Sequence, residues 1–208
     1  MTTTNAWYRR LGDLPGGRSR VECFFNDEHL DGSTIELVDD ARHFPEAERI
    51  WSADLDDEQR TRIVVPFTAE TAPEAWFVEV RSLEEGRPRV TLVAFCTGQL
   101  PDGTIVDDAT YTKLPVGNAD QSAAIRWWAD TAIVDEIFVQ PAFRRTHLGT
   151  KLIYTASGFH QHHRWPDRLH SDGRRTDLGQ RFVAGLRHPD RIASWTDRAA
   201  DMDHPEPT

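Results

Sequence analysis

Two adjacent arginines and a glycine in a short turn are the residues best suited to bind an anion. Arg144, Arg145 and Gly149 lie in the stretch 139–152, VQPAFRRTHLGTKL, between an apolar, strand-like segment and a helical pattern. The first N–H groups of a helix have no intrahelical partner and lie at the positive end of its dipole. A strand, a basic turn and a helix N-terminus together predict a phosphate-binding loop.

The residues of metal-ligand type form no comparable pattern. His160 and His163 are spaced to share one helix face, but no cysteine stands near them and the chain has no HExxH motif. Cys23 and Cys96 are far apart and neither belongs to a CxxC motif. We therefore expect no metal site and two free thiols.

Composition limits the partners of the chain. It has 208 residues and a net charge of −10, which disfavours a general nucleic-acid binder. No apolar run is long enough to cross a membrane, and the N-terminal stretch lacks the apolar core of a secretory signal. We expect a cytoplasmic protein that binds neither nucleic acid nor membrane, and we leave a homodimer open.

Hydrophobic periodicity and turn residues define the elements that must position the loop. We expect a flexible N-terminal arm over 1–19, a domain over 20–188 and a partly disordered tail over 189–208. Helical spacing favours helices at 45–55, 148–162 and 176–186, and a short one at 56–62. β-prone runs favour strands at 20–25, 33–38, 75–81, 89–97, 104–113, 132–139 and 169–171. This order predicts one α/β (α+β) domain with a mixed, mostly antiparallel sheet flanked by helices.

The stretch 139–152 resembles the cofactor motif of the GNAT superfamily of N-acetyltransferases. In that family a strand ending in Val-x-Pro leads through an aromatic-Arg pair and a Gly-containing turn into a helix. The positions that match are Val139, Pro141, Phe143, Arg144, Arg145, Leu148, Gly149 and Leu152, whereas His147 stands where the first glycine normally is. The resemblance covers about 75–186 and is weak outside 130–155.

The resemblance implies a GNAT-like domain that binds acetyl-CoA as co-substrate and acetylates a primary amine of a small molecule or peptide. The backbone of Ile137, Phe138 and Val139 would pair with the pantetheine arm, at a place where the sheet splays open. The pyrophosphate would be bound by the loop residues Arg144, Arg145, Thr146, His147, Leu148, Gly149 and Thr150.

Catalysis in such an enzyme requires a base for the amine and an acid for the leaving thiolate. The resemblance points to Asp135 or Glu136 as the base. Because adjacent strand residues point to opposite faces, only one of them can face the substrate, and we prefer Glu136 for its reach. The family often uses a tyrosine of the later helix as the acid, but 176–186 contains none, and Ser171 is a substitute.

Two other functions compete with the transferase. The absent tyrosine and His147 motivate a catalytically inactive acyl-CoA-binding or regulatory GNAT-like domain. A small interaction protein without a ligand is the third reading. The acidic net charge favours a cationic acceptor such as a polyamine, an aminoglycoside-like amine or a basic peptide terminus.

Overall fold

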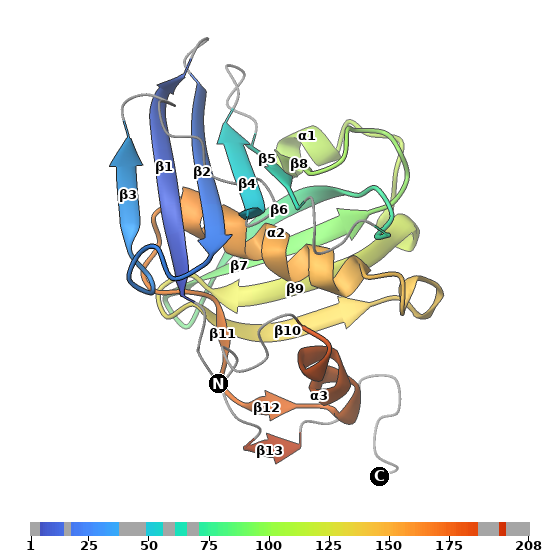
Figure 1. Ribbon diagram of the computed structural model, residues 1–208. Helices are drawn as coiled ribbons and strands as arrows, with labels where there is room; N and C mark the ends of the chain where they lie inside the picture. The colour runs from blue at the N-terminus through green and yellow to red at the C-terminus, as the bar shows by residue number, and fades with distance from the viewer. Residues whose placement is uncertain are drawn as a thin grey trace.

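The computed structural model describes residues 5–14, 18–37, 49–55, 61–65, 71–186 and 196–198. Within these ranges the chain forms a mixed, mostly antiparallel sheet of eleven strands and three α-helices, an α+β fold that is mostly β (Figure 1). The strand order is β11-β10-β9-β7-β6-β8-β5-β4-β2-β1-β3. The predicted mixed sheet with flanking helices is therefore confirmed.

The elements have the following bounds. The strands of the large sheet are β1 (Ala6–Leu14), β2 (Arg18–Phe25), β3 (Thr34–Leu37), β4 (Arg49–Leu55), β5 (Thr61–Val64), β6 (Trp76–Glu84), β7 (Arg87–Phe95), β8 (Thr104–Asp107), β9 (Gln121–Trp128), β10 (Ile133–Val139) and β11 (His170–Ser171). A separate two-stranded sheet pairs β12 (Arg174–Arg175) with β13 (Asp197–Arg198). The helices are α1 (Asp108–Tyr111), α2 (Leu148–His162) and α3 (Asp177–Ala184).

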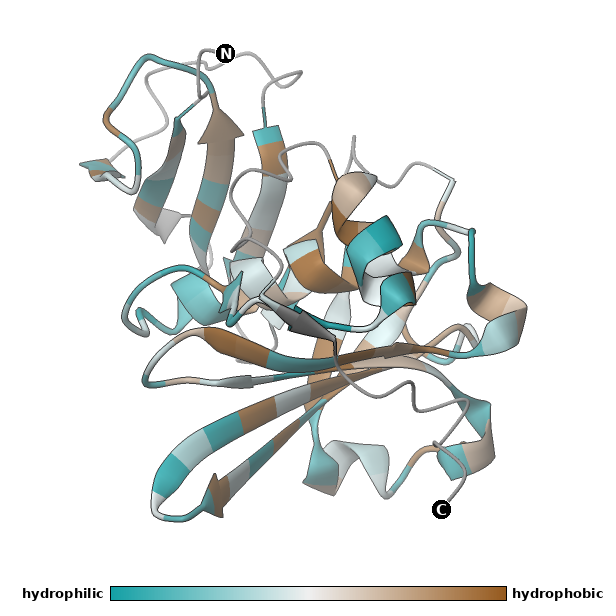
Figure 2. Cartoon of the chain, turned by 90° about the horizontal axis from the view of Figure 1, so that it is seen from below, coloured by the Kyte–Doolittle hydropathy of each residue, from teal (hydrophilic) through white to brown (hydrophobic). Residues whose placement is uncertain are grey.

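Helix α2 has the predicted bounds and lies across the sheet. Its apolar stripe, Leu148, Leu152, Ala156 and Phe159, is buried at 1% exposure or less. The strands of the sheet turn around this helix, so that β1, β2 and β4 face one side of it while β9 and β10 lie on the other (Figure 1). Figure 2 shows the apolar residues along the strands and hydrophilic residues at the hairpin turns. Burial of the stripe of α2 therefore holds the two halves of the sheet together.

Two tight turns follow directly from glycine. Glu85 and Gly86 both have positive φ, as in the two-residue turns that suit a β-hairpin, and they join β6 to β7. Gly103 has φ 80°, and a Cβ there would lie 2.2 Å from the carbonyl oxygen of Ile63. The turn at Pro101-Asp102-Gly103 thus brings the start of β8 against β5.

Several predictions for the N-terminal third are wrong. The flexible arm expected over 1–19 contains β1, whose Trp7 is fully buried and whose strand pairs with β2 and β3. The helix expected at 45–55 is a strand from Arg49 onward, and residues 45–48 lie outside the described ranges. Ile50 and Trp51 are both buried although they point to opposite faces, so the apolar spacing reflects a strand covered on both sides.

Two further boundaries differ from prediction. Residues 61–62, expected at the end of a short helix, begin β5, and residues 56–60 lie outside the described ranges. The strand expected over 104–113 ends at Asp107, whose carboxylate accepts the Thr110 N–H and begins α1. A side chain that caps a helix favours the helix over a longer strand, and the hydrophobic periodicity of the sequence does not reveal such a cap.

The C-terminal elements agree with prediction where they are described. Thr176 caps α3 by accepting the Gly179 N–H at 3.0 Å. No residue of α3 is fully buried, and Phe182 is its contact with the start of α2. Among the described residues, no helix is long and apolar enough to span a bilayer.

Candidate functional site

The loop between β10 and α2 presents backbone donors without acceptors. The N–H groups of Phe143 and Arg144 bond back to Gln140 and Pro141, and the Lys151 N–H bonds to the His147 carbonyl. Between them, the six N–H groups of residues 145–150 have no acceptor among the described residues. Free donors at this density, at the positive end of a 15-residue helix, are chemically suited to an anion.

Two residues of this loop adopt the left-handed conformation. Arg145 has φ 65° and His147 has φ 63°. A left-handed residue followed by a helical one, as His147 is by Leu148, directs successive N–H groups to the same side. This conformation also explains why the family motif has glycine at the position of His147, because glycine adopts it without strain.

The side chains of the loop divide into two roles. Arg144 donates from Nε to the Val139 carbonyl at 3.1 Å, and the Thr146 hydroxyl donates to the Phe143 carbonyl at 2.7 Å, so both shape the turn. Arg145 and His147 are exposed, and neither makes an ion pair with any described residue. Arg145 is therefore the loop guanidinium available to a ligand.

Strand β10 is unpaired along most of its outer edge. β11 pairs with it only through Ile133 with His170 and Val134 with Ser171. From Asp135 to Val139 no described strand lies on that side, although Arg144 occupies the Val139 carbonyl. Alternate residues of β10 bond to β9, and Gln140 N–H donates to Ser122, so Phe138 faces β9 and the backbone groups of Ile137 face the open edge. This edge lies at the place where the resemblance predicts a splayed sheet.

The predicted orientation of the two strand acids is wrong. A register shift between Val134 and Glu136 interrupts the pairing of β10 with β9. Asp135 then reaches Arg126 at 3.0 Å, and Glu136 reaches the same guanidinium at 2.6 Å. A β-bulge breaks the strict alternation of a strand, so both carboxylates lie by one arginine instead of on opposite faces.

Ion pairing also changes the chemistry of these acids. Burial acts to raise the pKa of Asp135, but the hydrogen bond from Arg89 and the charge of Arg126 outweigh it and hold the pKa below its usual value. A carboxylate held ionised by two arginines is a weak proton acceptor. The structure therefore does not favour Asp135 as the base.

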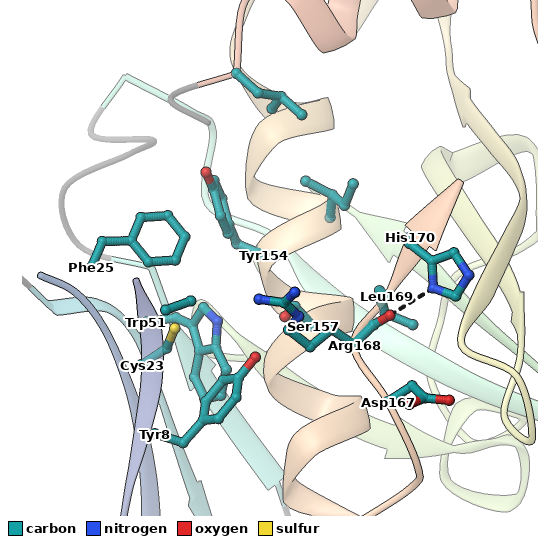
Figure 3. Close-up of a pocket in the computed structure, with 13 residues that line it drawn as sticks. Tyr8, Cys23, Phe25, Trp51, Tyr154, Ser157, Asp167, Arg168, Leu169 and His170 are labelled. Atoms are coloured by element: carbon teal, nitrogen blue, oxygen red, sulfur yellow. Dashed lines mark hydrogen bonds between the residues drawn. The ribbon is translucent and has the colours of Figure 1, made fainter. Parts of the chain in front are cut away.

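His170, which the sequence did not single out as catalytic, stands beside Ser171 in β11. Its Nδ1 lies 2.9 Å from the Arg168 carbonyl oxygen (Figure 3). Because a carbonyl oxygen only accepts, Nδ1 carries the proton and Nε2 presents a lone pair. Ser171 accepts the Gly173 N–H at 2.9 Å, which leaves its hydroxyl hydrogen available to donate.

Gly149 has a packing role in addition to the one predicted. A Cβ at this position would lie 3.2 Å from Cε2 of Phe182 and 3.5 Å from Cγ2 of Val139. Phe182 of α3 therefore rests on the first turn of α2.

The remaining polar groups near α2 are structural. Lys151 is only 5% exposed, and its Nζ donates to the Pro73 carbonyl at 3.0 Å and pairs with Asp102. His160 accepts from Trp127 and donates to the Pro166 carbonyl, and burial lowers its pKa. Its two ring nitrogens are thus both engaged within the fold.

Comparison of the chain with known protein families, curated proteins and solved structures finds no match in any of the three. The function is therefore inferred from the loop, the open strand edge and His170.

Proposed function

We propose that the chain is an acetyl-CoA-dependent N-acetyltransferase with a GNAT-like domain, which acetylates a primary amine. The observation that carries this proposal is the run of six N–H groups over residues 145–150 that have no acceptor in the described part of the chain. A diphosphate offers several acceptor oxygens and negative charge to such donors. Arg145 adds an exposed positive charge at the same place.

The open edge of β10 is suited to bind the pantetheine arm of acetyl-CoA. From Val139 back to Asp135 the strand covers about 13 Å at ~3.3 Å per residue. The pantetheine arm has amide groups that pair with an exposed strand edge, as an added strand does. Bound in this direction, a thioester would lie near the point where β11 leaves β10, beside Ser171.

We assign the removal of the amine proton to His170. The amine must lose a proton as it attacks the thioester, and the lone pair on His170 Nε2 is suited to accept it. Ser171 follows His170 in β11 and points to the opposite face of the strand, so the thiolate leaves without a proton from this hydroxyl. Asp135 and Glu136 would instead hold Arg126 in place at the edge of the site.

A non-catalytic acyl-CoA-binding domain is the second candidate. The observations that favour it are the pairing of both predicted base residues with Arg126 and the lack of a tyrosine in α3. In this case acetyl-CoA binds but no amine is acetylated.

Calorimetry with acetyl-CoA and a thiol-release assay with an amine panel test the two candidates together. Saturable binding with amine-dependent thiol release supports the transferase. Binding without release for any amine supports the second candidate. No binding heat and no shift in Tm rejects both.

A further inference from the structure

A cavity of about 310 Å³ lies between α2 and the inner face of β1, β2 and β4. Figure 3 shows Tyr8, Phe25 and Trp51 on the sheet side and Tyr154 on the helix. The ring centroids of Tyr8 and Trp51 are 6.0 Å apart, so the two rings form one aromatic wall. The volume falls in the range of small-molecule sites, and walls of this kind contact flat apolar groups.

The indole of Trp51 offers a buried hydrogen-bond donor to this cavity. Trp51 is only 1% exposed, and its Nε1 makes no hydrogen bond with any residue that the structure describes. Figure 3 shows this nitrogen on the side of the ring that faces the guanidinium of Arg168. Buried N–H groups normally have an acceptor, because their desolvation is otherwise uncompensated. Since an indole N–H can only donate, it favours a ligand with an acceptor oxygen.

The guanidinium of Arg168 reaches into the same cavity (Figure 3). Its Nη1 donates to Oδ2 of Asp31 at 2.8 Å, and Oδ1 of Asp31 accepts the Ala6 N–H at 2.7 Å, so this ion pair holds the guanidinium in place. Nε and Nη2 of Arg168 make no hydrogen bond with the described residues, and a guanidinium presents such donors in a planar fork that matches a carboxylate. The side chains of the ion pair are 43% and 40% exposed, so water screens the Asp31 charge and a second carboxylate can share the guanidinium.

The other polar groups of the cavity do not oppose an anion. Figure 3 shows the Asp167 carboxylate and the His170 ring pointing away from the cavity, and the His170 ring donates to the Arg168 carbonyl. The Ser157 hydroxyl makes no hydrogen bond with the described residues and can donate as well. The donors of Trp51, Arg168 and Ser157 therefore face a cavity into which none of its lining residues turns a carboxylate.

We propose that this cavity binds a small aromatic carboxylate, with its ring between the aromatic walls and its carboxylate on Arg168 and Trp51. An ammonium group in the same place would meet the guanidinium, and like charges repel. A ring without an acceptor would leave the indole N–H unpaired. The inference does not rest on the proposed acetyl transfer, because Ser157 lies about 13 Å along α2 from the loop of residues 145–150, at ~1.5 Å per residue. It assigns the chain a second ligand besides acetyl-CoA.

Calorimetry with the full chain tests this site, with phenylacetate as the probe and phenylacetamide and phenethylamine as ligands of the same shape. We expect saturable binding of phenylacetate, at least about tenfold weaker binding of the neutral amide, and no binding of the amine at the same concentrations. Arg168→Gln should raise the Kd for phenylacetate at least about tenfold, and Trp51→Phe about fivefold, because each variant loses a donor and keeps a side chain of similar shape. Arg174→Gln, the same change at another exposed arginine, is the matched control.

The comparison of the three ligands uses only the wild type, so it decides the question even where a variant fails to fold. If the amide or the amine binds as tightly as phenylacetate, or if none of the three binds, the cavity is not a carboxylate site. A wild-type Kd for phenylacetate in Arg168→Gln, or an equal loss in Arg174→Gln, shows that the probe binds elsewhere and overturns the assignment. Acetyl-CoA is titrated in parallel, and none of the substituted residues lies in the loop of residues 145–150, so failure of this site leaves the proposed transferase standing.

Discussion

Reversing the charge of Arg145 is expected to weaken acetyl-CoA binding without changing the fold. The side chain is exposed, and it makes no hydrogen bond or ion pair with the described residues. Substitutions at such positions change the free energy of unfolding by about 0.5 kcal/mol or less. A loss of affinity in Arg145→Glu would therefore report on the ligand and not on folding.

The magnitude follows from the change of two charge units next to a diphosphate. Two unit charges ~4 Å apart in water interact with about 1 kcal/mol. A change of two units, reduced by salt screening, then removes roughly 1–2 kcal/mol of binding free energy. This corresponds to a rise in Kd of about five- to thirtyfold.

Calorimetry at low and high sodium chloride concentration checks this expectation. The deficit of Arg145→Glu should shrink as salt rises, because exposed charges are screened. Arg164→Glu is the matched control, since Arg164 is exposed just beyond the other end of α2, about 24 Å from its start. Wild-type affinity in Arg145→Glu, or an equal loss in Arg164→Glu, would refute a phosphate site at this loop.

Three further predictions concern catalysis and stability. His170→Asn keeps a donor for the Arg168 carbonyl but removes the free lone pair. We expect kcat to fall about a hundredfold and KM for acetyl-CoA to stay constant; an unchanged kcat excludes the base role. Glu22 is fully buried between Arg9 and Arg49, so Glu22→Ala should lower the free energy of unfolding by about 3–5 kcal/mol in urea titration; a loss below 1 kcal/mol would show that the arginines are easily rehydrated. Burial, and then the charge of Arg81, lower the pKa of His163 to about 4, whereas an unfolded histidine titrates near 6.5. Below pH ~6.5 the unfolded state therefore binds more protons than the folded state, so the free energy of unfolding is highest above pH ~6.5 and falls as the pH drops toward 4. Allowing for partial exposure of the ring, the loss is about 2 kcal/mol. In His163→Asn the free energy of unfolding should depend less steeply on pH.

Elements defined by one strong local signal were predictable. Helix α2 has an uninterrupted apolar stripe, and this stripe alone is enough to predict where a packed helix begins and ends. Thr176 as the cap of α3 is a similar case, because side chain and acceptor are three residues apart. The loop before α2 was found for the same reason, since its residues are contiguous in the chain.

Elements that depend on distant partners were not predictable. Arg9 and Arg10 make the start of the chain polar, and Arg9 is buried because Glu22 of β2 neutralises it. The common orientation of Asp135 and Glu136 depends on a bulge against β9, which strand alternation does not encode. The proposed role of His170 rests on a hydrogen bond from its ring to the Arg168 carbonyl, and this geometry cannot be read from residue types.

The most direct test of the central claim is a backbone amide NMR titration of the labelled protein with acetyl-CoA. Hydrogen bonding to phosphate is expected to shift the amide protons of residues 145–150 together, at one common Kd, and CoA without the acetyl group should give the same shifts. Unshifted amides at these six positions in the presence of saturating acetyl-CoA would contradict a pyrophosphate site at the start of α2.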